Sequence, residues 1–284
     1  MNHCLIITAY KDIENLNRLI HYAPEEWGIY IHLDKKSSIR KEEIDKRAHV
    51  YQKKRIYWGA WEHLWVVHFL LREALTSDIH YDYYHLITGQ DFFACPTNEF
   101  DDIVGKQGFN YMGIFPIPNK HWGWEMGLAI FKYKTLASFG DIRKNPLRLL
   151  NSIWKYVQKL TNTQKALPKY PLYGGPLYCS ITDEFVRWML KSEFANRLLD
   201  RLKHSICSEE VFLPTVIMNS PFKDTVKIDV TLRYVDWHSN PKPKFLDYSD
   251  YDKIINTKNL FCRKTDSKIS KDLIRALEQL QPIK

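Results

Sequence analysis

The chain has 284 residues, of which 45% are hydrophobic and 26% charged. These fractions are ordinary for a globular protein and exclude a disordered or collagen-like chain. At this length, folding can remove about three quarters of the extended chain's surface from solvent, which is enough for one large domain. The net charge of +8 favours an anionic partner, such as a nucleic acid, a phospholipid or a phosphorylated small molecule.

The sequence shows no sign of export. No apolar run reaches the ~18 residues of a membrane-spanning helix, and the N-terminal residues lack a basic leader. We therefore expect a cytoplasmic protein without a membrane anchor. No two cysteines have the C-x-x-C spacing, so zinc binding and thioredoxin-like chemistry are not expected. Five free, mostly packed thiols are expected instead: Cys4, Cys95, Cys179, Cys207 and Cys262.

The first ninety residues alternate between strand-like and helix-like patterns. Strands are predicted over residues 4–9, 28–33, 55–58 and 83–88, and helices over 12–23 and 61–76. This order is typical of a parallel sheet covered by helices. Such sheets bind ligands beyond the carboxyl ends of their strands. Those ends carry residues 32–34, 58–59 and 89–91 here.

The second half is less regular and contains no repeat or long linker, so we expect a single domain. One helix is predicted over 148–160 and a loop over 165–176. A strand over 177–181 leads into a helix over 182–191 with Thr182 as its N-cap. A helix over 208–219 begins at Ser208 with two glutamates in its first turn. Short strands over 226–230 and 232–237 precede a last helix over 270–280.

The common nucleotide-binding and hydrolase motifs are absent, so any phosphate group must be contacted by Lys, Arg or a helix N-terminus. His32 and Asp34 point to the same side of a predicted strand end. Asp34 there either accepts hydrogen bonds from a ribose or a base, or caps the following turn. Asp91, which follows Gly89 and Gln90, has the same two interpretations.

Glu209 and Glu210 also have two interpretations. They either compensate the dipole of the helix that they open, or one of them is a general base that removes a proton from an acceptor hydroxyl. The abundant aromatic residues either pack in the core or stack on sugar rings. The acidic clusters at 101–102 and 247–252 are expected to be solvated surface rather than a metal site.

Six segments, taken together and in this order, resemble the core-2/I-branching β-1,6-N-acetylglucosaminyltransferase family, which includes peptide O-xylosyltransferases. They run from near the start of the chain to near its end, while the stretch 120–170 matches poorly. The segments are IYIHLDKKS (29–37), YWGAWEHLWVVHFLLREAL (57–75), YDYYHLITGQDFFACPTNEF (81–100), SEEVFLPT (208–215), LRYVDW (232–237) and LFCRKTD (260–266).

The resemblance implies an α/β, GT-A-like fold with a Rossmann-type, mostly parallel sheet and flanking helices. Residues 1–115 would form a nucleotide-sugar half, and residues 116–284 an acceptor half with a basic C-terminal segment. The implied reaction is inverting transfer of a sugar from a UDP-sugar to a hydroxyl of a glycan or lipid-linked saccharide. The sugar would be GlcNAc, with xylose or another hexose as alternatives, and neither a metal ion nor another cofactor would be needed.

Site residues follow from the same resemblance. Glu210 matches the family's catalytic base, although Ser208 and Glu209 stand where proline and aspartate are common. Lys244 and Lys264 match the basic residues that neutralise the diphosphate. The remaining expected contacts are His32, Asp34, Asp91 and Arg233 for the donor, and Glu125 and Trp237 for the acceptor; for Trp237 the alternative is core packing.

The absence of an anchor and of a stem suggests a bacterial-type relative that works on polysaccharide precursors. It would act in the cytoplasm, with peripheral association at the inner face of the membrane through its basic surface. The alternative from another class is a non-catalytic glycan- or nucleotide-binding protein of the same fold. A nucleic-acid-binding protein is disfavoured, because 33 acidic residues are interspersed with the basic ones and no recognised module is present.

Overall fold

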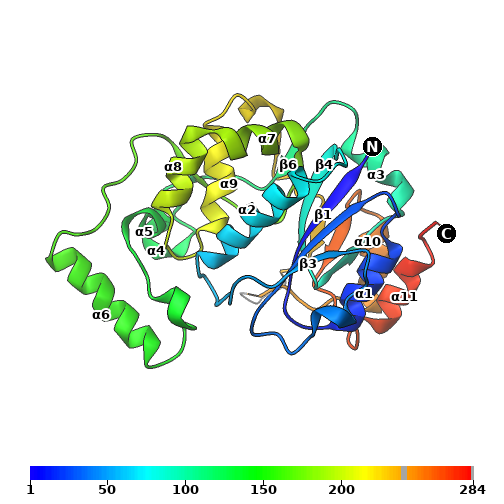
Figure 1. Cartoon of the computed structure of the whole chain (residues 1–284), viewed down its shortest axis with the longest axis horizontal. Coiled ribbons are helices and arrows are strands. Elements are labelled where there is room, and N and C mark those ends of the chain that lie inside the picture. The colour runs from blue at the N-terminus through cyan, green and yellow to red at the C-terminus, as the bar shows by residue number, and fades with distance from the viewer. Residues whose placement is uncertain (238–241, 283–284) are drawn as a thin grey trace.

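The computed structural model describes residues 1–237 and 242–282. A mixed, mostly parallel seven-stranded sheet runs through the molecule (Figure 1). The first three strands and the strand over 83–88 are mutually parallel, and the sheet turns antiparallel only at β9. The predicted α/β class is thereby confirmed. Across the sheet the strands are β10 (Val226–Ile228), β6 (Asn110–Met112), β9 (Ser180–Thr182), β4 (Tyr83–Thr88), β1 (His3–Ala9), β2 (Gly28–Leu33) and β3 (His49–Tyr51).

Two smaller sheets complete the strand content of the described residues. The first contains β11 (Arg233–Val235), β12 (Phe261–Arg263) and β5 (Asp91–Phe93), and the second pairs β7 (Phe115–Ile117) with β8 (Leu172–Gly174). Because β5 follows β4 after a two-residue turn, its antiparallel pairing with β12 brings the C-terminal part of the chain back to the carboxyl end of β4. That pairing places residues 261–266 beside the predicted ligand-binding edge.

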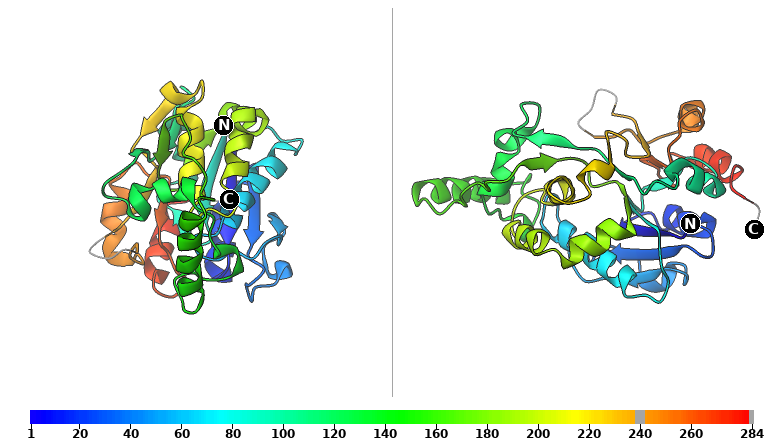
Figure 2. Two further views of the ribbon diagram at one scale, coloured as in Figure 1. Left: turned by 90° about the vertical axis from the view of Figure 1, so that its left-hand side faces the viewer. Right: turned by 90° about the horizontal axis from the view of Figure 1, so that it is seen from above.

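Helices cover the central sheet on both sides and enclose two hydrophobic cores (Figures 1 and 2). One core lies under α1 (Ile13–Tyr22), α3 (Phe100–Val104), α10 (Tyr251–Ile255) and α11 (Lys271–Glu278). The other lies under α2 (Glu62–Leu75), α5 (Leu128–Lys132), α7 (Asp183–Lys191), α8 (Glu193–Arg201) and α9 (Glu209–Met218). All five cysteines are buried and free, as predicted.

Most predicted elements are confirmed to within three residues at each end, but the strand over 55–58 is wrong. The third parallel strand is β3, and the chain leaves the sheet after Tyr51. The imidazole Nε2 of His32 accepts the backbone N–H groups of Lys53 and Lys54, at 3.2 and 3.1 Å. These N–H groups are therefore used by a side chain instead of a neighbouring strand. The loop expected over 165–176 also contains the short strand β8.

The middle of the chain contains α4 (Gly123–Met126), which lies beside α5, and α6 (Leu147–Leu160), which projects as an arm that stands clear of the body (Figure 1). Three successive residues of α4, Trp124, Glu125 and Met126, have positive φ angles of 55°, 58° and 62°. This conformation costs non-glycine residues about 1–2 kcal/mol each, so surrounding contacts must hold it. Within 1–237 and 242–282, no helix is long and apolar enough to cross a membrane.

Candidate active site

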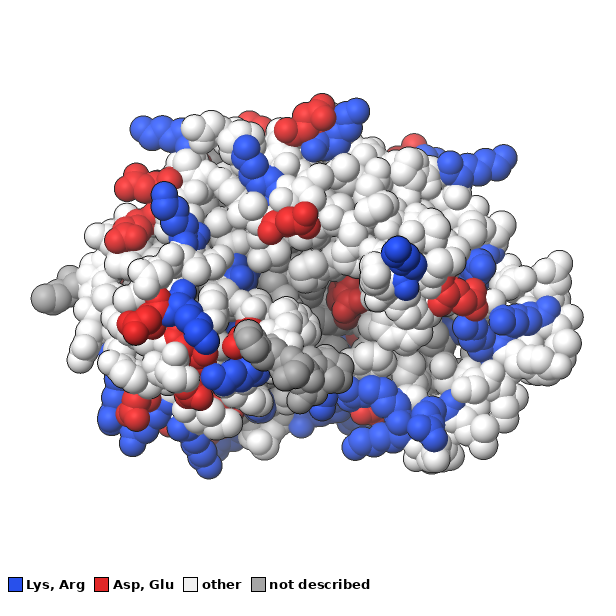
Figure 3. Space-filling model, turned by 180° about the vertical axis from the view of Figure 1, so that it is seen from behind, with Lys and Arg blue, Asp and Glu red and all other residues white. Residues whose placement is uncertain are grey.

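The predicted ligand-binding edge lies where β1, β2 and β4 end, and α9 begins beside it. On the face opposite to that of Figure 1, the surface is hollowed near its middle, with basic side chains along the lower rim (Figure 3). A carboxylate follows β2 at Asp34 and another follows β4 at Asp91, and both are almost completely buried. Their partners decide whether they are available to a ligand.

His32 and Asp34 are held by the protein itself. Burial lowers the pKa of His32 to about 4, so its ring is neutral and Nε2 can accept the two backbone N–H groups described above. The Asp34 carboxylate accepts hydrogen bonds from Lys36 N and Nζ at 2.8 and 2.9 Å. It also accepts the backbone N–H of Ile56 at 3.3 Å. Asp34 thus caps the turn after β2, the second of its two interpretations, and its contact with a donor stays a prediction.

Asp91 belongs to a buried charged cluster. One oxygen accepts hydrogen bonds from the backbone N–H and the hydroxyl of Thr88, and the other lies 3.3 Å from Arg263 Nε. The Arg263 guanidinium is stacked on the Tyr178 ring, with 3.3 Å between its carbon and the ring centroid. The pKa of Tyr178 is raised by burial, which outweighs the opposite effect of Arg263, and Asp91 and Glu209 add to the increase. Tyr178 therefore lies close enough to both Asp91 and Glu209 for their charges to affect its hydroxyl.

The two lysines predicted to contact the diphosphate have different surroundings. Lys244 Nζ donates to Asp250 Oδ2 at 2.8 Å and lies 3.5 Å from Asp247 Oδ2, and the hydrogen bond to Asp250 raises its pKa. Asp250 is fully buried, which corrects the expectation of a solvated side chain for this residue, whereas Asp252 in the same cluster is exposed. Lys264 Nζ has no ion pair among the described residues. Lys264 is thus the lysine whose charge is available to a ligand.

Lys264 lies in a positively charged environment. Burial lowers the pKa of its ammonium, and the nearby charges of Arg263, Lys11 and Lys242 lower it further, against the opposing effect of Asp91. A bound anion would relieve this repulsion. The backbone holds Lys264 in place, because its carbonyl accepts the N–H of Leu246 at 2.8 Å.

Arg233 is a buried structural residue in this structure. Its guanidinium donates to the Ser180 hydroxyl at 2.7 Å and to the backbone carbonyls of Cys179, Thr231 and Leu86 at 2.7, 2.6 and 3.4 Å. Burial lowers its pKa to about 10. These bonds tie β11 to β4 and β9, and a direct donor contact of Arg233 stays a prediction.

The first turn of α9 points its two glutamates into different surroundings. Glu209 is buried, and its Oε1 lies 3.4 Å from His63 Nδ1, whose other nitrogen lies 3.4 Å from the Thr8 hydroxyl at the end of β1. The other Glu209 oxygen is buried without a hydrogen-bond partner among the described residues, as is the Ser208 hydroxyl. Ser208 begins the helix as predicted but does not cap it.

Glu210 faces a cavity of about 410 Å³ that is lined mostly by apolar and aromatic side chains. This volume is within the range of small-ligand sites. Burial raises the pKa of Glu210 to about 8, and the neighbouring charge of Glu209 contributes to the increase. The other lining residues are Phe115, Asn119, His121, Trp122, Gly175 and Pro176.

Glycines allow this cavity to form. The N–H of Gly175 donates to the carbonyl of Glu210 at 2.8 Å, which joins the loop after β8 to the first turn of α9. A Cβ atom at Gly175 would lie 1.9 Å from the carbonyl oxygen of Gly113, so no other residue fits there. Trp122 packs against the backbone of Gly174 and Gly127, where a Cβ would lie 2.4 and 2.8 Å from its ring.

Glu125, the predicted acceptor contact, lies outside this cavity. Its carboxylate is paired with Lys155 at 2.9 Å, Lys132 at 3.2 Å and Lys159 at 3.9 Å. Partial burial would raise its pKa, but hydrogen bonds from Lys155 and Lys132 outweigh this effect and lower it. These pairs help to hold the left-handed backbone of α4. The role of Glu125 toward an acceptor stays a prediction.

Trp237, the other predicted acceptor contact, is 59% exposed at the end of the small sheet. The core-packing alternative for this residue is therefore wrong. The structure does not bring Trp237 into the cavity of Glu210, whose lining is given above. Its contact with an acceptor stays a prediction.

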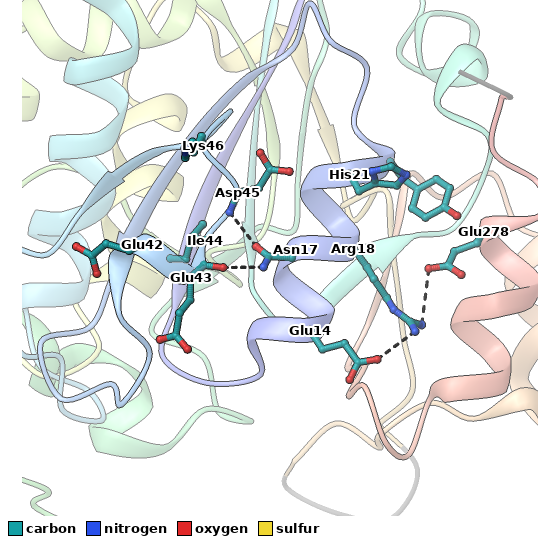
Figure 4. Close-up of a pocket in the computed structure, with 11 residues that line it drawn as sticks. Glu14, Asn17, Arg18, His21, Glu42, Glu43, Ile44, Asp45, Lys46 and Glu278 are labelled. Carbon is teal, nitrogen blue, oxygen red and sulfur yellow. Dashed lines mark hydrogen bonds and ion pairs between the residues drawn. The ribbon is translucent and has the colours of Figure 1, made fainter.

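A larger depression of about 820 Å³ lies elsewhere, between α1, the segment 42–46 and α11 (Figure 4). It is bordered by Arg18, which lies 3.0 Å from Glu14 and 3.7 Å from Glu278. On the opposite side, the Asn17 side chain connects α1 to the segment 42–46: its amide nitrogen donates to the carbonyl of Glu43, and its amide oxygen accepts the N–H of Asp45. None of the predicted site residues borders it, so size alone does not locate the site.

Several residues at the strand-end cluster and at the cavity of Glu210 were not predicted from the sequence. They are Lys11, His63, Tyr178 and Arg263 at the strand-end side, and His121 and Trp122 at the cavity of Glu210. Arg263 directly precedes Lys264 in a matched segment, which was a usable signal. The others are distant in sequence from their partners, so only the fold brings them together. In the described parts of the chain, no three His, Cys, Asp or Glu side chains are grouped as metal ligands.

This α/β chain thus carries a carboxylate at a mostly apolar cavity and a basic cluster at the carboxyl ends of its parallel strands. Residues 128–255 match the family model described as "Branch: Core-2/I-Branching enzyme". This match confirms the resemblance for the segment that carries Glu210, Trp237 and Lys244. Residues 128–255 are thus similar to the Core-2/I-branching enzymes, which are glycosyltransferases.

Curated protein sequences and solved structures add little to the match with the family model. No curated protein sequence matches the chain. Mouse xyloside xylosyltransferase 1, in an apo crystal structure, aligns with 92% of this chain and 97% of its own chain, at 10% sequence identity and a TM-score of 0.35. A likeness this weak carries no information on substrate.

Proposed function

We propose that the protein transfers a sugar from a UDP-sugar to a hydroxyl of a glycan or lipid-linked saccharide, with inversion at the anomeric carbon. The observation that carries this proposal is the placement of Glu210. Its carboxylate is partly buried at an aromatic cavity that can hold a sugar acceptor, and its pKa is raised to about 8. Sugars bind protein sites through aromatic faces and a few polar groups, which this lining offers.

The chemistry is a single displacement. Glu210 accepts the proton of the acceptor hydroxyl while that oxygen forms its bond to the anomeric carbon. The bond from this carbon to the diphosphate oxygen breaks, and UDP leaves with the electron pair. Glu210 never bonds to the sugar, so the configuration inverts. A carboxylate with a raised pKa is a stronger base than an ordinary one, and such catalysis contributes about 10²–10⁴-fold to the rate.

The developing charge on the diphosphate requires positive charge nearby, and we assign this role first to Lys264. Its ammonium has no carboxylate partner among the described residues, and Arg263 and Lys11 lie in the same electrostatic cluster. Lys244 supports the site through its backbone carbonyl, which accepts the Lys264 N–H at 3.3 Å, while its ammonium is paired with Asp250. On this proposal, residues 1–115 and the returning segment around β12 hold the nucleotide, and the remainder holds the acceptor.

A donor screen tests the proposed function. UDP-GlcNAc, UDP-xylose, UDP-galactose and UDP-glucose are compared for UDP release, each with and without EDTA. We expect release from one donor, GlcNAc first, at equal rates in both conditions, because lysine side chains supply the positive charge. Loss of activity in EDTA that Mn²⁺ restores would contradict the metal-independent mechanism. Tight UDP binding without release from any donor would favour a non-catalytic binding protein.

A further inference from the structure

The helix α6 has its polar side turned toward the protein. Asn151 Oδ1 accepts the backbone N–H of Leu136 at 2.9 Å, and the Gln158 side chain bonds both backbone groups of Lys134, at 3.0 and 2.9 Å. Lys155 and Lys159 pair with Glu125. An amphipathic helix of a globular protein normally buries its apolar side, so this arrangement is inverted.

The apolar side of α6 is consequently exposed to solvent. With 3.6 residues per turn, its large apolar side chains fall on one continuous side of the helix. Figures 1 and 2 show α6 projecting from the body, with no other element of residues 1–237 and 242–282 over that side. The exposed fractions are 60% for Leu149, 50% for Leu150, 50% for Ile153, 37% for Trp154, 61% for Tyr156 and 67% for Leu160.

The surroundings of this apolar side are strongly basic. Residues 141–170 contain seven Lys or Arg and one Asp, a net charge of +6 within a chain whose total is +8. Lys144 and Arg148 are exposed at the start of α6. An exposed apolar side with Trp and Tyr, flanked by Lys and Arg, is typical of helices that lie in the interface of an anionic bilayer.

We propose that α6 is a membrane-surface helix that inserts its apolar side into the headgroup region of an anionic lipid bilayer. The charge of the arm decides between this occupant and a second copy of the chain. In a symmetric dimer the same patch would face itself, so the exposed Lys144 and Arg148 of one copy would meet those of the other. Anionic headgroups instead complement the charge, at about 1 kcal/mol for each basic residue near the surface.

Vesicle flotation of the full chain tests this proposal. Vesicles of phosphatidylcholine with a quarter phosphatidylglycerol are compared with phosphatidylcholine alone, at low and high salt. We expect the wild type to float with the anionic vesicles and to be released by salt. The variant Leu150→Ser/Ile153→Ser should lower the partition coefficient by about tenfold or more. Lys144→Glu/Arg148→Glu should lower it on anionic vesicles only.

The matched control is Ile79→Ser/Ile269→Ser, which removes two isoleucines that are 50% and 54% exposed elsewhere on the surface. This control should float like the wild type, and unchanged melting temperatures show that all variants fold. Failure of the wild type to bind anionic vesicles would overturn the proposal, as would equal loss in the control. Dimerisation in sedimentation that Leu150→Ser/Ile153→Ser abolishes, without vesicle binding, would assign the surface to a second copy.

Discussion

The strand-end cluster and the cavity of Glu210 use charge in opposite ways. At the strand-end side, Asp91 and Arg263 are paired and Lys264 lies among other cations, so positive charge is concentrated where a ligand can reach it. At the other side, Glu210 lies among apolar and aromatic side chains, and no Lys or Arg of the described residues lines its cavity. A leaving diphosphate needs nearby cations, whereas a general base must be free of them to keep a raised pKa. On the proposed function, this difference would let one site serve both needs.

Removing the base should have the largest effect. Glu210→Gln keeps the shape of the side chain and its place in the cavity but cannot accept a proton. We expect kcat for sugar transfer to fall by about 10²–10⁴-fold, with UDP affinity unchanged, because UDP belongs to the basic side. Steady-state kinetics and calorimetric titration with UDP measure the two quantities.

The control for this variant is Glu184→Gln, which changes an exposed glutamate in the first turn of α7. It should leave kcat unchanged. A loss of UDP affinity equal to the loss of kcat in Glu210→Gln would show that Glu210 serves the donor rather than the acceptor, and the comparison between the two sides would fail.

The two lysines of the basic side should differ. Lys264→Ala removes the cation that has no carboxylate partner and should weaken UDP binding by about 10- to 100-fold, which corresponds to one charge-assisted hydrogen bond. Lys244→Ala should change UDP affinity less than about fivefold, by the ~1 kcal/mol or less of an indirect contact. It should lower the melting temperature instead, because the buried carboxylate of Asp250 loses its partner.

Calorimetry with UDP and thermal unfolding separate these two effects. If Lys244→Ala weakens UDP binding as much as Lys264→Ala does and leaves the melting temperature unchanged, Lys244 must leave Asp250 and contact the diphosphate directly.

A smaller effect is expected on stability. The pKa of Glu210 is raised from an ordinary 4.5 to about 8 in the folded chain. Between these values the native state holds a proton that the unfolded chain has released, so this group lowers stability as the pH rises. The melting temperature of Glu210→Gln relative to wild type should therefore increase from about pH 5 to about pH 8 and then level off. A difference that is independent of pH would show that the carboxylate is not desolvated.

Periodicity and strand composition predicted most of the elements, because a buried strand or helix side requires apolar residues at a fixed spacing. Both α1 and α6 follow such a pattern, yet α1 buries Leu16, Leu19 and Ile20 while α6 exposes its apolar side. The spacing indicates a helix and its two sides, but only the fold determines which side faces the protein. The positive φ angles of α4 have no counterpart in a local pattern.

For the candidate site, the sequence likewise predicted the positions of some residues in helices and strands but not the partners of their side chains. The position of Glu210 at the start of a helix could be predicted, and so could the strand-end positions of Asp34 and Asp91. The partners of Arg233, Lys244 and His32 could not be predicted, because these side chains bond to backbone and carboxylate groups that local patterns do not reveal. A basic or polar residue that the resemblance assigns to the site can thus also form bonds within the protein.

The pH dependence of kcat/KM tests most directly whether Glu210 is the base. Below its raised pKa only a small fraction of Glu210 is ionised, so the rate should increase about tenfold per pH unit up to about pH 7 and level off above about pH 8.5. In Glu209→Gln the profile should shift to lower pH, because the charge of Glu209 contributes to the raised pKa. In Glu210→Gln the remaining rate should lose this dependence. A wild-type profile that is flat between about pH 6 and 8.5, or one that Glu210→Gln retains, would contradict the assignment of Glu210 as the catalytic base.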